Sequence, residues 1–150
     1  MIQRAAAGLA QLYEADETAW LEAMAELIQQ ARWDELDYAH LGEYLSDMAR
    51  RDRREVKSRL TTLLAHVLKW VHQPEHRSRS WRATIVEQRQ ELSELAAGGV
   101  LRNHAEAVLP DAYAEAVERA AAETGLAAES LPTECPYTLE QLLSPDFPGD

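Results

Sequence analysis

Apolar side chains recur along this chain at spacings of three and four residues, and no segment alternates apolar and polar residues with β-branched enrichment. Spacings of three and four place side chains on one face of an α-helix, whereas a strand requires a period of two. The pattern therefore predicts an all-α fold, a small helical bundle of about four to five helices with one long central helix. Since 150 residues is the usual size of one domain, we expect a single helical domain over residues 1–150, with 1–11 and 148–150 as loose ends.

The first predicted helix covers about residues 16–31, and Asp16 is suited to cap its N-terminus. Before it, Leu9, Leu12 and Tyr13 predict a short additional turn or helix. The buried face of the helix over residues 16–31 is expected to comprise Trp20, Leu21, Met24, Leu27, Ile28 and Ala31.

The longest predicted helix covers residues 38–72, about 35 residues against a usual mean of about 12. A short connection over residues 33–37 precedes it, and either Asp34 or Asp37 caps it. At 100° per residue, the apolar stripe of its second half is turned by roughly 70° from that of its first half. Either the helix bends around residues 49–54, or its two halves pack against different neighbours.

Pro74 ends the long helix, and a loop over residues 73–79 leads to a third helix that reaches about Ala97. Ser80, or alternatively Ser78, is expected to cap this helix. Its inner face is predicted to comprise Trp81, Ile85, Leu92 and Leu95.

The two glycines at 98–99 stop the third helix, and a further helical region covers residues 101–124. Pro110 is expected to break this region into two pieces, or to occupy the first turn of the second piece. Gly125 closes it. The remaining tail predicts a loop followed by one short helix, because Thr138 begins a capping-box pattern.

Several features of the sequence indicate the cellular location of the protein. The longest apolar stretch, residues 60–71, is too short and too polar to span a bilayer, so we expect no membrane association. Residues 1–10 lack the apolar block and cleavage site of a secretory signal. The lone Cys135 forms no internal disulfide, which is typical of a reducing compartment. These features predict a cytoplasmic protein.

The formal net charge of −11 disfavours non-specific nucleic-acid binding by the molecule as a whole, but the charge is unevenly distributed. Residues 1–49 carry 2 basic and 10 acidic side chains, residues 50–89 carry 11 and 4, and residues 90–150 carry 2 and 12. A basic middle segment therefore lies between two acidic arms.

Several motifs resemble a known family. The central ones are Leu63-Leu-Ala-His-Val-Leu-Lys-Trp70, Gln73-Pro74, Arg77-Ser-Arg-Ser-Trp-Arg-Ala-Thr-Ile85 and Glu87-Gln-Arg89, and the flanking ones are residues 16–20, 33–37 and 134–143. Over about residues 12–147 the chain is similar to the bacterial domain of unknown function family 29. The resemblance implies a small helical bundle with no established activity and no cofactor.

The sequence departs from the family pattern at one place. Where many members resemble Leu-x-Glu-Glu-Ile-Glu, this chain reads Leu41-Gly-Glu-Tyr-Leu-Ser46 and retains only Glu43 of the three carboxylates. Ala49 stands where members often have glycine. A metal or acid–base role for those carboxylates in relatives would not carry over to this protein.

Two basic groups are the main candidate binding sites. On a helix, Arg50, Arg53, Arg54 and Lys57 lie within about 100° of arc and form a cationic ridge. The second group, Arg77, Arg79 and Arg82, surrounds the start of the third helix, where free backbone N–H groups favour anions. One interpretation is an anion or nucleic-acid contact. The favoured interpretation is that these side chains pair with the acidic first and fourth helices.

Other chemical candidates are weaker. Trp70 and Trp81 would serve as stacking platforms for nucleic acid, although tryptophan at helical spacing is more often part of the core. His66 and Lys69 have the spacing of an acid–base pair, although a histidine within an apolar stretch is usually a packing residue. No catalytic residue, metal ligand or cofactor is predicted, since neither nucleophile, phosphate-binding nor dinucleotide motifs are present.

The sequence therefore favours a non-catalytic accessory or protein-interaction module, whose partner is a second copy or another protein. The alternative is anion or nucleic-acid binding through the basic middle segment. An enzyme of an unrecognised type is the third reading, and it requires a pocket lined by His66, Lys69 or Glu43.

Overall fold

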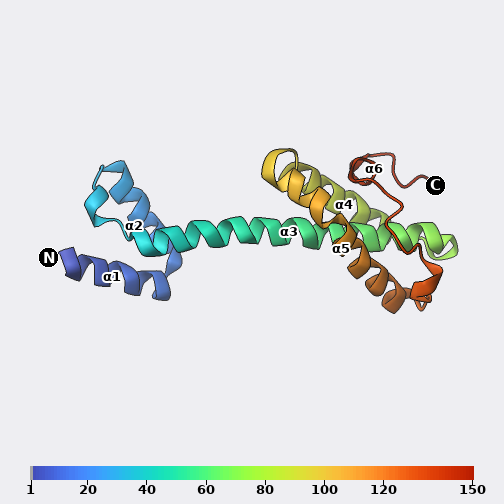
Figure 1. Ribbon diagram of the computed structural model, residues 1–150, viewed down its shortest axis with the longest axis horizontal. Coiled ribbons are helices and arrows are strands. Elements are labelled where there is room, and N and C mark those ends of the chain that lie inside the picture. The colour runs from blue at the N-terminus through green and yellow to red at the C-terminus, as the bar shows by residue number, and fades with distance from the viewer. Residues whose placement is uncertain (1) are drawn as a thin grey trace. The chain divides into compact units, whose positions relative to one another are not determined.

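The computed structural model describes residues 2–150, which form six α-helices and three short 3-10 helices without any strand (Figure 1). The all-α prediction with one long helix is confirmed. The elements are α1 (Ile2–Ala15), α2 (Glu17–Gln29), η1 (Trp33–Glu35), α3 (Tyr38–His72), η2 (Pro74–His76), α4 (Arg79–Leu95), α5 (Gly99–Thr124), η3 (Ala128–Ser130) and α6 (Leu139–Leu143).

The described residues divide into two compact units: an N-terminal unit that ends at Arg50 and a C-terminal unit, Arg51–Asp150. The helix α3 is uninterrupted over 35 residues and contributes its first half to one unit and its second half to the other. The boundary falls where the sequence pattern turns its apolar stripe. Of the two predicted alternatives, the halves of α3 do pack against different neighbours.

The N-terminal unit is built around Trp20, which is fully buried. Its ring lies 4.8 Å from that of Tyr13 and 5.9 Å from that of Tyr44, measured between centroids. Its indole N–H donates to Asp37 Oδ2 at 3.2 Å, while the backbone N–H of His40 donates to Asp37 Oδ1. Asp37 is therefore the predicted cap of α3, and it also fastens the core of the unit.

The predicted buried face of α2 is too broad. Asp16 caps the helix as predicted, but only Trp20 and Met24 are buried, and Ile28 is exposed. At 100° per residue, Ile28 lies about 80° around the helix from Trp20. Ala31 follows the end of the helix and is also exposed. The apolar residues of α2 therefore occupy a wider arc of the helix than the other elements of the unit cover.

The helix α1 covers Ile2–Ala15 and precedes the capped start of α2. Met1 lies outside the described residues. Of the predicted turn or helix that includes Leu9, Leu12 and Tyr13, the structure has the helix, and these residues lie in the second half of its 14 residues.

The core of the C-terminal unit lies between the second half of α3 and the helices α4, α5 and α6. The cap of α4 is Ser78, which accepts the N–H of Trp81, so the preferred prediction of Ser80 is wrong. Ser78 has the extended backbone of a cap, whereas Ser80 already lies inside the helix. The fully buried side chains include Val56, Leu60, Leu63, Leu64, Val67, Leu68, Ile85, Leu92, Leu139 and Leu142.

The helix α5 passes through Pro110 without a break, so the prediction that this proline divides the helix is wrong. The proline is exposed, while Ala105, Ala112 and Tyr113 are buried on either side of it. Packing on both sides thus holds the helix together across the missing backbone hydrogen bond. Gly125, at a φ of 78°, closes the helix as predicted.

The tail closes over the C-terminal unit. Thr138 and Gln141 form the predicted capping box at the start of α6. Near the end of the chain, the carbonyl of Gly149 accepts the indole N–H of Trp70 at 3.1 Å. Within residues 2–150, no helix has the combination of length and apolar character that a membrane crossing requires.

Replacing Pro110 by alanine restores a backbone donor inside α5 and removes the clash of the ring with the preceding turn. We expect Pro110→Ala to raise the free energy of unfolding by about 1–3 kcal/mol. Urea denaturation followed by circular dichroism measures this. Glu118→Ala, at an exposed position of the same helix, is the control and should change stability by less than about 0.5 kcal/mol. A destabilised Pro110→Ala protein would show that the proline fits this helix better than alanine does.

Candidate interaction surfaces

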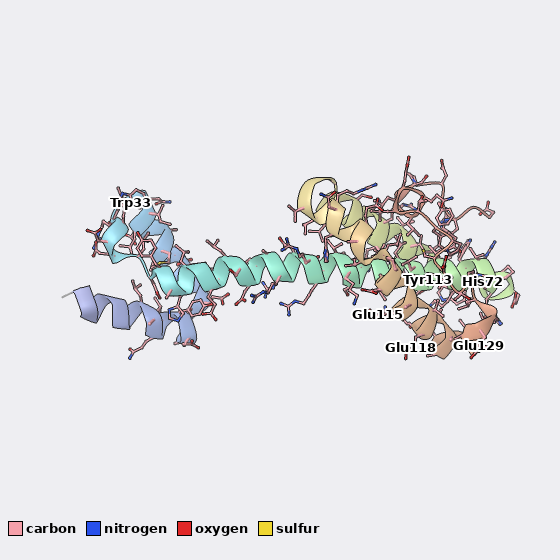
Figure 2. The ribbon with its side chains drawn as sticks, viewed as in Figure 1. Trp33, His72, Tyr113, Glu115, Glu118 and Glu129 are labelled. Atoms are coloured by element: carbon pink, nitrogen blue, oxygen red, sulfur yellow. The ribbon has the colours of Figure 1, made fainter. Side chains whose placement is uncertain are left out.

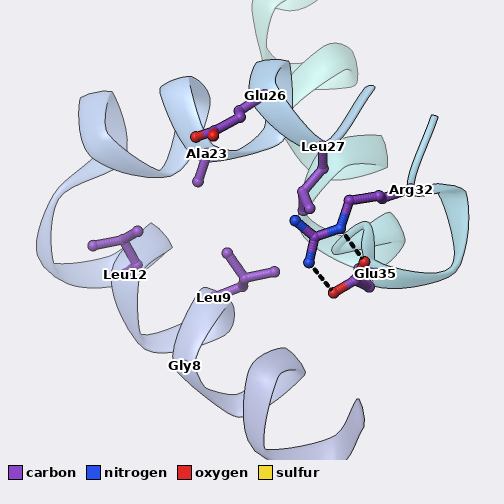
Figure 3. A pocket seen from close by; sticks show the side chains of 8 residues that line it. All are labelled: Gly8, Leu9, Leu12, Ala23, Glu26, Leu27, Arg32 and Glu35. Carbon is purple, nitrogen blue, oxygen red and sulfur yellow. Dashed lines mark hydrogen bonds and ion pairs between the residues drawn. The ribbon is translucent and has the colours of Figure 1, made fainter. Parts of the chain in front are cut away.

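The N-terminal unit contains a pocket of about 400 Å³ between α1, α2 and the segment around η1. Figure 3 shows Leu9 and Leu12 of α1 on one side and Leu27 of α2 on the other. The remaining lining residues are Gly8, Ala23, Glu26, Arg32 and Glu35. The pocket therefore has an apolar floor and charged side chains on its rim.

The rim is held by a two-bonded ion pair, in which Arg32 Nε and Nη2 donate to the two carboxylate oxygens of Glu35 at 2.5 and 2.6 Å (Figure 3). The hydrogen bond from Arg32 lowers the pKa of Glu35. The chain turns toward this pair at Ala31, whose φ of 55° lies in the left-handed region. The N–H of Arg32 then donates to the carbonyl of Leu27 and closes the end of α2.

Exposed apolar side chains gather in the same unit. Within residues 8–150, six large apolar side chains are exposed, and four of them belong to the N-terminal unit. These four are Ile28 (42% exposed), Trp33 (53%), Tyr38 (62%) and Leu45 (61%). A unit of about fifty residues thus leaves four large apolar side chains in water.

The predicted cationic ridge is only partly paired. Lys57 Nζ lies 2.8 Å from Oε1 of Glu115 in α5, and Figure 2 labels Glu115. The hydrogen bond between these two side chains raises the pKa of Lys57. Arg50 lies 3.4 Å from Asp47, one turn earlier in α3. Arg53 and Arg54 are exposed, and no hydrogen bond or ion pair joins them to another side chain within residues 8–150. These two arginines are the part of the ridge that is open to a ligand.

The second basic group is used mainly within the fold. Arg77 Nε donates to the carbonyl of Trp70 at 2.9 Å, and its guanidinium lies 4.7 Å from the centre of that ring. Arg82 donates to the carbonyl of Pro148 at 3.2 Å. Of the three, only Arg79 is exposed, and among the described residues no side chain pairs with it. The structure therefore does not gather the three arginines around one open site.

The sequence interpretation missed Arg89, which is 8% exposed and donates to the carbonyl of Phe147 at 3.0 Å. Burial lowers its pKa, and the nearby charge of Arg82 contributes. A signal was present, because Arg89 lies four residues after Ile85 and three before Leu92, on the predicted inner face of α4. A long basic side chain at such a position fastens one segment to another.

His66 and the buried Lys69 form a polar cluster with Glu123, which lies at the surface on α5. Lys69 Nζ lies 2.7 Å from Glu123 Oε2, 3.4 Å from His66 Nε2 and 5.0 Å from the ring centre of Trp81. His66 Nδ1 lies 2.9 Å from the carbonyl of Thr62, which only accepts, so Nδ1 carries the proton and Nε2 accepts from Lys69. Burial lowers the pKa of His66. Each donor is satisfied within the fold, which favours the packing interpretation.

A second pocket, of about 430 Å³, lies beside α5 and is lined in part by Tyr113, Cys135 and Tyr137. Burial raises the pKa of the Cys135 thiol, which therefore stays protonated and weakly nucleophilic at neutral pH. Burial also raises the pKa of Tyr113 to about 12, and its hydroxyl donates to the carbonyl of Pro132 at 2.5 Å. This pocket offers no activated group, and neither pocket is lined by His66 or Lys69.

Comparison with known proteins agrees with the sequence motifs. The model of the family described as domain of unknown function DUF29 matches residues 12–148. The chain belongs to this family. The searches of curated proteins and of solved structures found no match to this chain. The match to DUF29 covers nearly the whole chain, and the description of the family states no function.

Removing the carboxylate of Glu123 leaves the buried ammonium of Lys69 without its ion pair. We expect Glu123→Gln to lower the free energy of unfolding by about 1–2 kcal/mol at pH 7, less than for a fully buried pair because Glu123 is partly exposed. The hydrogen bond from Lys69 holds the pKa of Glu123 below its ordinary value of 4.5.

This shift sets the pH dependence of the effect. A depressed carboxyl pKa stabilises the fold fully above pH 4.5, and the contribution is lost as the pH falls through the folded-state value. Urea unfolding of both proteins between pH 7 and pH 3 measures the difference, with exposed Glu118→Gln as the control. A difference that persists unchanged at pH 3 would contradict the ion pair.

Proposed function

We propose that this protein is a non-catalytic interaction module, and that its N-terminal unit binds a protein partner through the pocket between α1 and α2. The observation that carries the proposal is the apolar surface of that unit, with an open pocket floored by Leu9, Leu12 and Leu27 and with exposed Ile28 and Trp33. Burying apolar surface contributes about 25 cal/mol per Å², so covering these side chains favours association.

Charge indicates the kind of partner that fits. Residues 1–49 carry 10 acidic and 2 basic side chains, and Glu26 and Glu35 stand on the rim of the pocket. Arg32 is already paired with Glu35. An amphipathic helix with an apolar face and lysine or arginine flanks would complement both the floor and the rim. Acidic segments would be repelled.

The pocket is tested by placing a photo-cross-linking amino acid at Leu12, which lines it, in the cells that normally make the protein. We expect one discrete adduct, reduced about tenfold or more by Leu27→Gln, which puts a polar amide into the apolar floor. The matched control is the same cross-linker at Ala25, an exposed position of α2 outside the lining. Equal adducts from both positions, or an adduct indifferent to Leu27→Gln, would refute a docking role for the pocket.

A second candidate function, anion or nucleic-acid binding, is favoured by one observation, the exposure of Arg53 and Arg54 without side-chain partners among residues 8–150. Phosphates held by such arginines release counterions, so the affinity falls as salt rises. Arg77 and Arg82 are engaged within the fold, which limits the available surface to the ridge and Arg79.

Fluorescence anisotropy with short mixed DNA and RNA tests this second function. If it holds, binding weakens with salt, and the Arg53→Ala/Arg54→Ala protein loses about two units of the salt slope and binds at least tenfold less tightly. The Arg102→Ala/Arg119→Ala protein removes two charges outside the basic middle segment and should bind like the wild type. Equal loss in both double variants would assign the effect to net charge rather than to the ridge.

A further inference from the structure

One face of α3 in the N-terminal unit carries exposed residues that follow a regular pattern. Tyr38, Gly42, Leu45 and Ala49 are spaced by four, three and four residues, and all four are exposed. At 100° per residue they lie within about 60° of arc and form a straight strip along the helix. The spacing is that of a seam along which two helices pack.

Neither backbone conformation nor close packing within the chain requires glycine at position 42. It lies inside α3, where glycine costs about 1 kcal/mol relative to alanine. A Cβ atom added at this position would meet no atom within 4 Å, and the φ of Gly42 is not in the left-handed region. The gap that Gly42 leaves in the strip is therefore suited to a group from outside the chain.

The strip is complementary to itself when two copies run antiparallel. With Leu45 of one copy placed opposite Gly42 of the other, Tyr38 falls opposite Ala49, because the residue numbers of both pairs sum to the same value. Each large side chain then faces a small one, and the two-fold axis repeats both contacts. We propose that this strip is a homodimer contact, in which α3 of a second copy packs antiparallel along it.

The charges near the strip permit this pairing. Its neighbours around the helix are Ala39 and Ser46 on one side and Leu41 and Met48 on the other, none of them charged. The acidic Glu43 and Asp47 lie about 130° and 170° from its centre. The two units still carry a net negative charge, so their long-range repulsion weakens as salt is added. Self-association should therefore strengthen with salt, opposite to binding of a basic or nucleic-acid partner.

The strip is short, so the dimer it forms is weak. Four residues over 12 positions span about 17 Å of helix, which gives a contact at the small end of specific interfaces. We expect a dissociation constant on the order of tens of micromolar. The strip is also separate from the pocket of the proposed function, because no residue lining that pocket belongs to α3.

Sedimentation velocity of the full chain from about 5 to 500 μM, at low and at 0.5 M salt, measures the pairing. The decisive variant is Gly42→Gln, which fills the gap with a flexible side chain that favours helix. We expect it to weaken the dimer at least about tenfold and to raise the unfolding midpoint of the dilute monomer. Ala107→Gln is the control, since Ala107 is an exposed position of α5 that lines neither pocket, and the substitution adds the same side chain away from the strip.

A compensating pair tests the register. Leu45→Ala alone removes the large partner, and Gly42→Leu alone places leucine opposite leucine, so each should weaken the dimer about tenfold. The combined Gly42→Leu/Leu45→Ala protein restores one large and one small side chain in each pair and should recover to within about threefold of the wild type. Such recovery, with tighter association at high salt, supports the proposal.

Three results would overturn it: a monomer throughout the concentration range, a dimer insensitive to Gly42→Gln, or a dimer that Ala107→Gln weakens equally. None of these results bears on the pocket, whose partner is tested by the cross-linker at Leu12. A failed homodimer and a failed docking pocket are therefore distinguished.

Discussion

A helix of 35 residues cannot bury its own apolar side chains, so each half of α3 depends on the elements packed around it. The second half is well covered, and five successive positions from Leu60 to Leu64 include four buried side chains. The first half has only α1, α2 and the ring cluster around Trp20. This unequal cover leaves Tyr38 and Leu45 exposed while Val56 and Leu60 are fully buried, and it concentrates the candidate binding surfaces in the N-terminal unit.

The basic side chains of residues 50–89 also divide into two groups, those bonded within the fold and those left in solvent. Lys57 and Lys69 reach carboxylates of α5, and Arg77, Arg82 and Arg89 donate to backbone carbonyls that hold the end of α3 and the tail. These contacts hold five of the eleven basic side chains of the segment within the fold. Arg53 and Arg54 are left in solvent on α3, with no carboxylate from another helix near enough to pair with them among the described residues. Charge counting alone could not distinguish the two uses, because both lie within one segment.

Sequence reasoning worked where structure is set locally. The spacing of apolar residues, the caps Asp16 and Thr138 and the stop at Gly125 each depend on a few neighbouring residues. It failed where distant contacts decide the outcome. Packing around Ala105 and Ala112 carries α5 through Pro110, and the limited cover of α2 leaves Ile28 in water. The cationic ridge was predicted from helical spacing, but the pairing of Lys57 with Glu115 depends on where α5 lies, which no local pattern contains. The pocket escaped prediction for the same reason, because α1, α2 and the residues around η1 build it together.

Several residues of the N-terminal unit depart from local preferences, and each departure lowers stability. Ile28 and Leu45 are apolar where they are exposed, and Gly42 and Ala31 have backbone environments that other residues would suit better. Each of these choices lowers the stability of an isolated chain. In the C-terminal unit, by contrast, buried cationic groups such as Lys69 and Arg89 find partners. If a partner covers the pocket and the open helix face, as proposed, the same apolar groups would contribute free energy to binding, and the stability given up locally would be recovered in the complex.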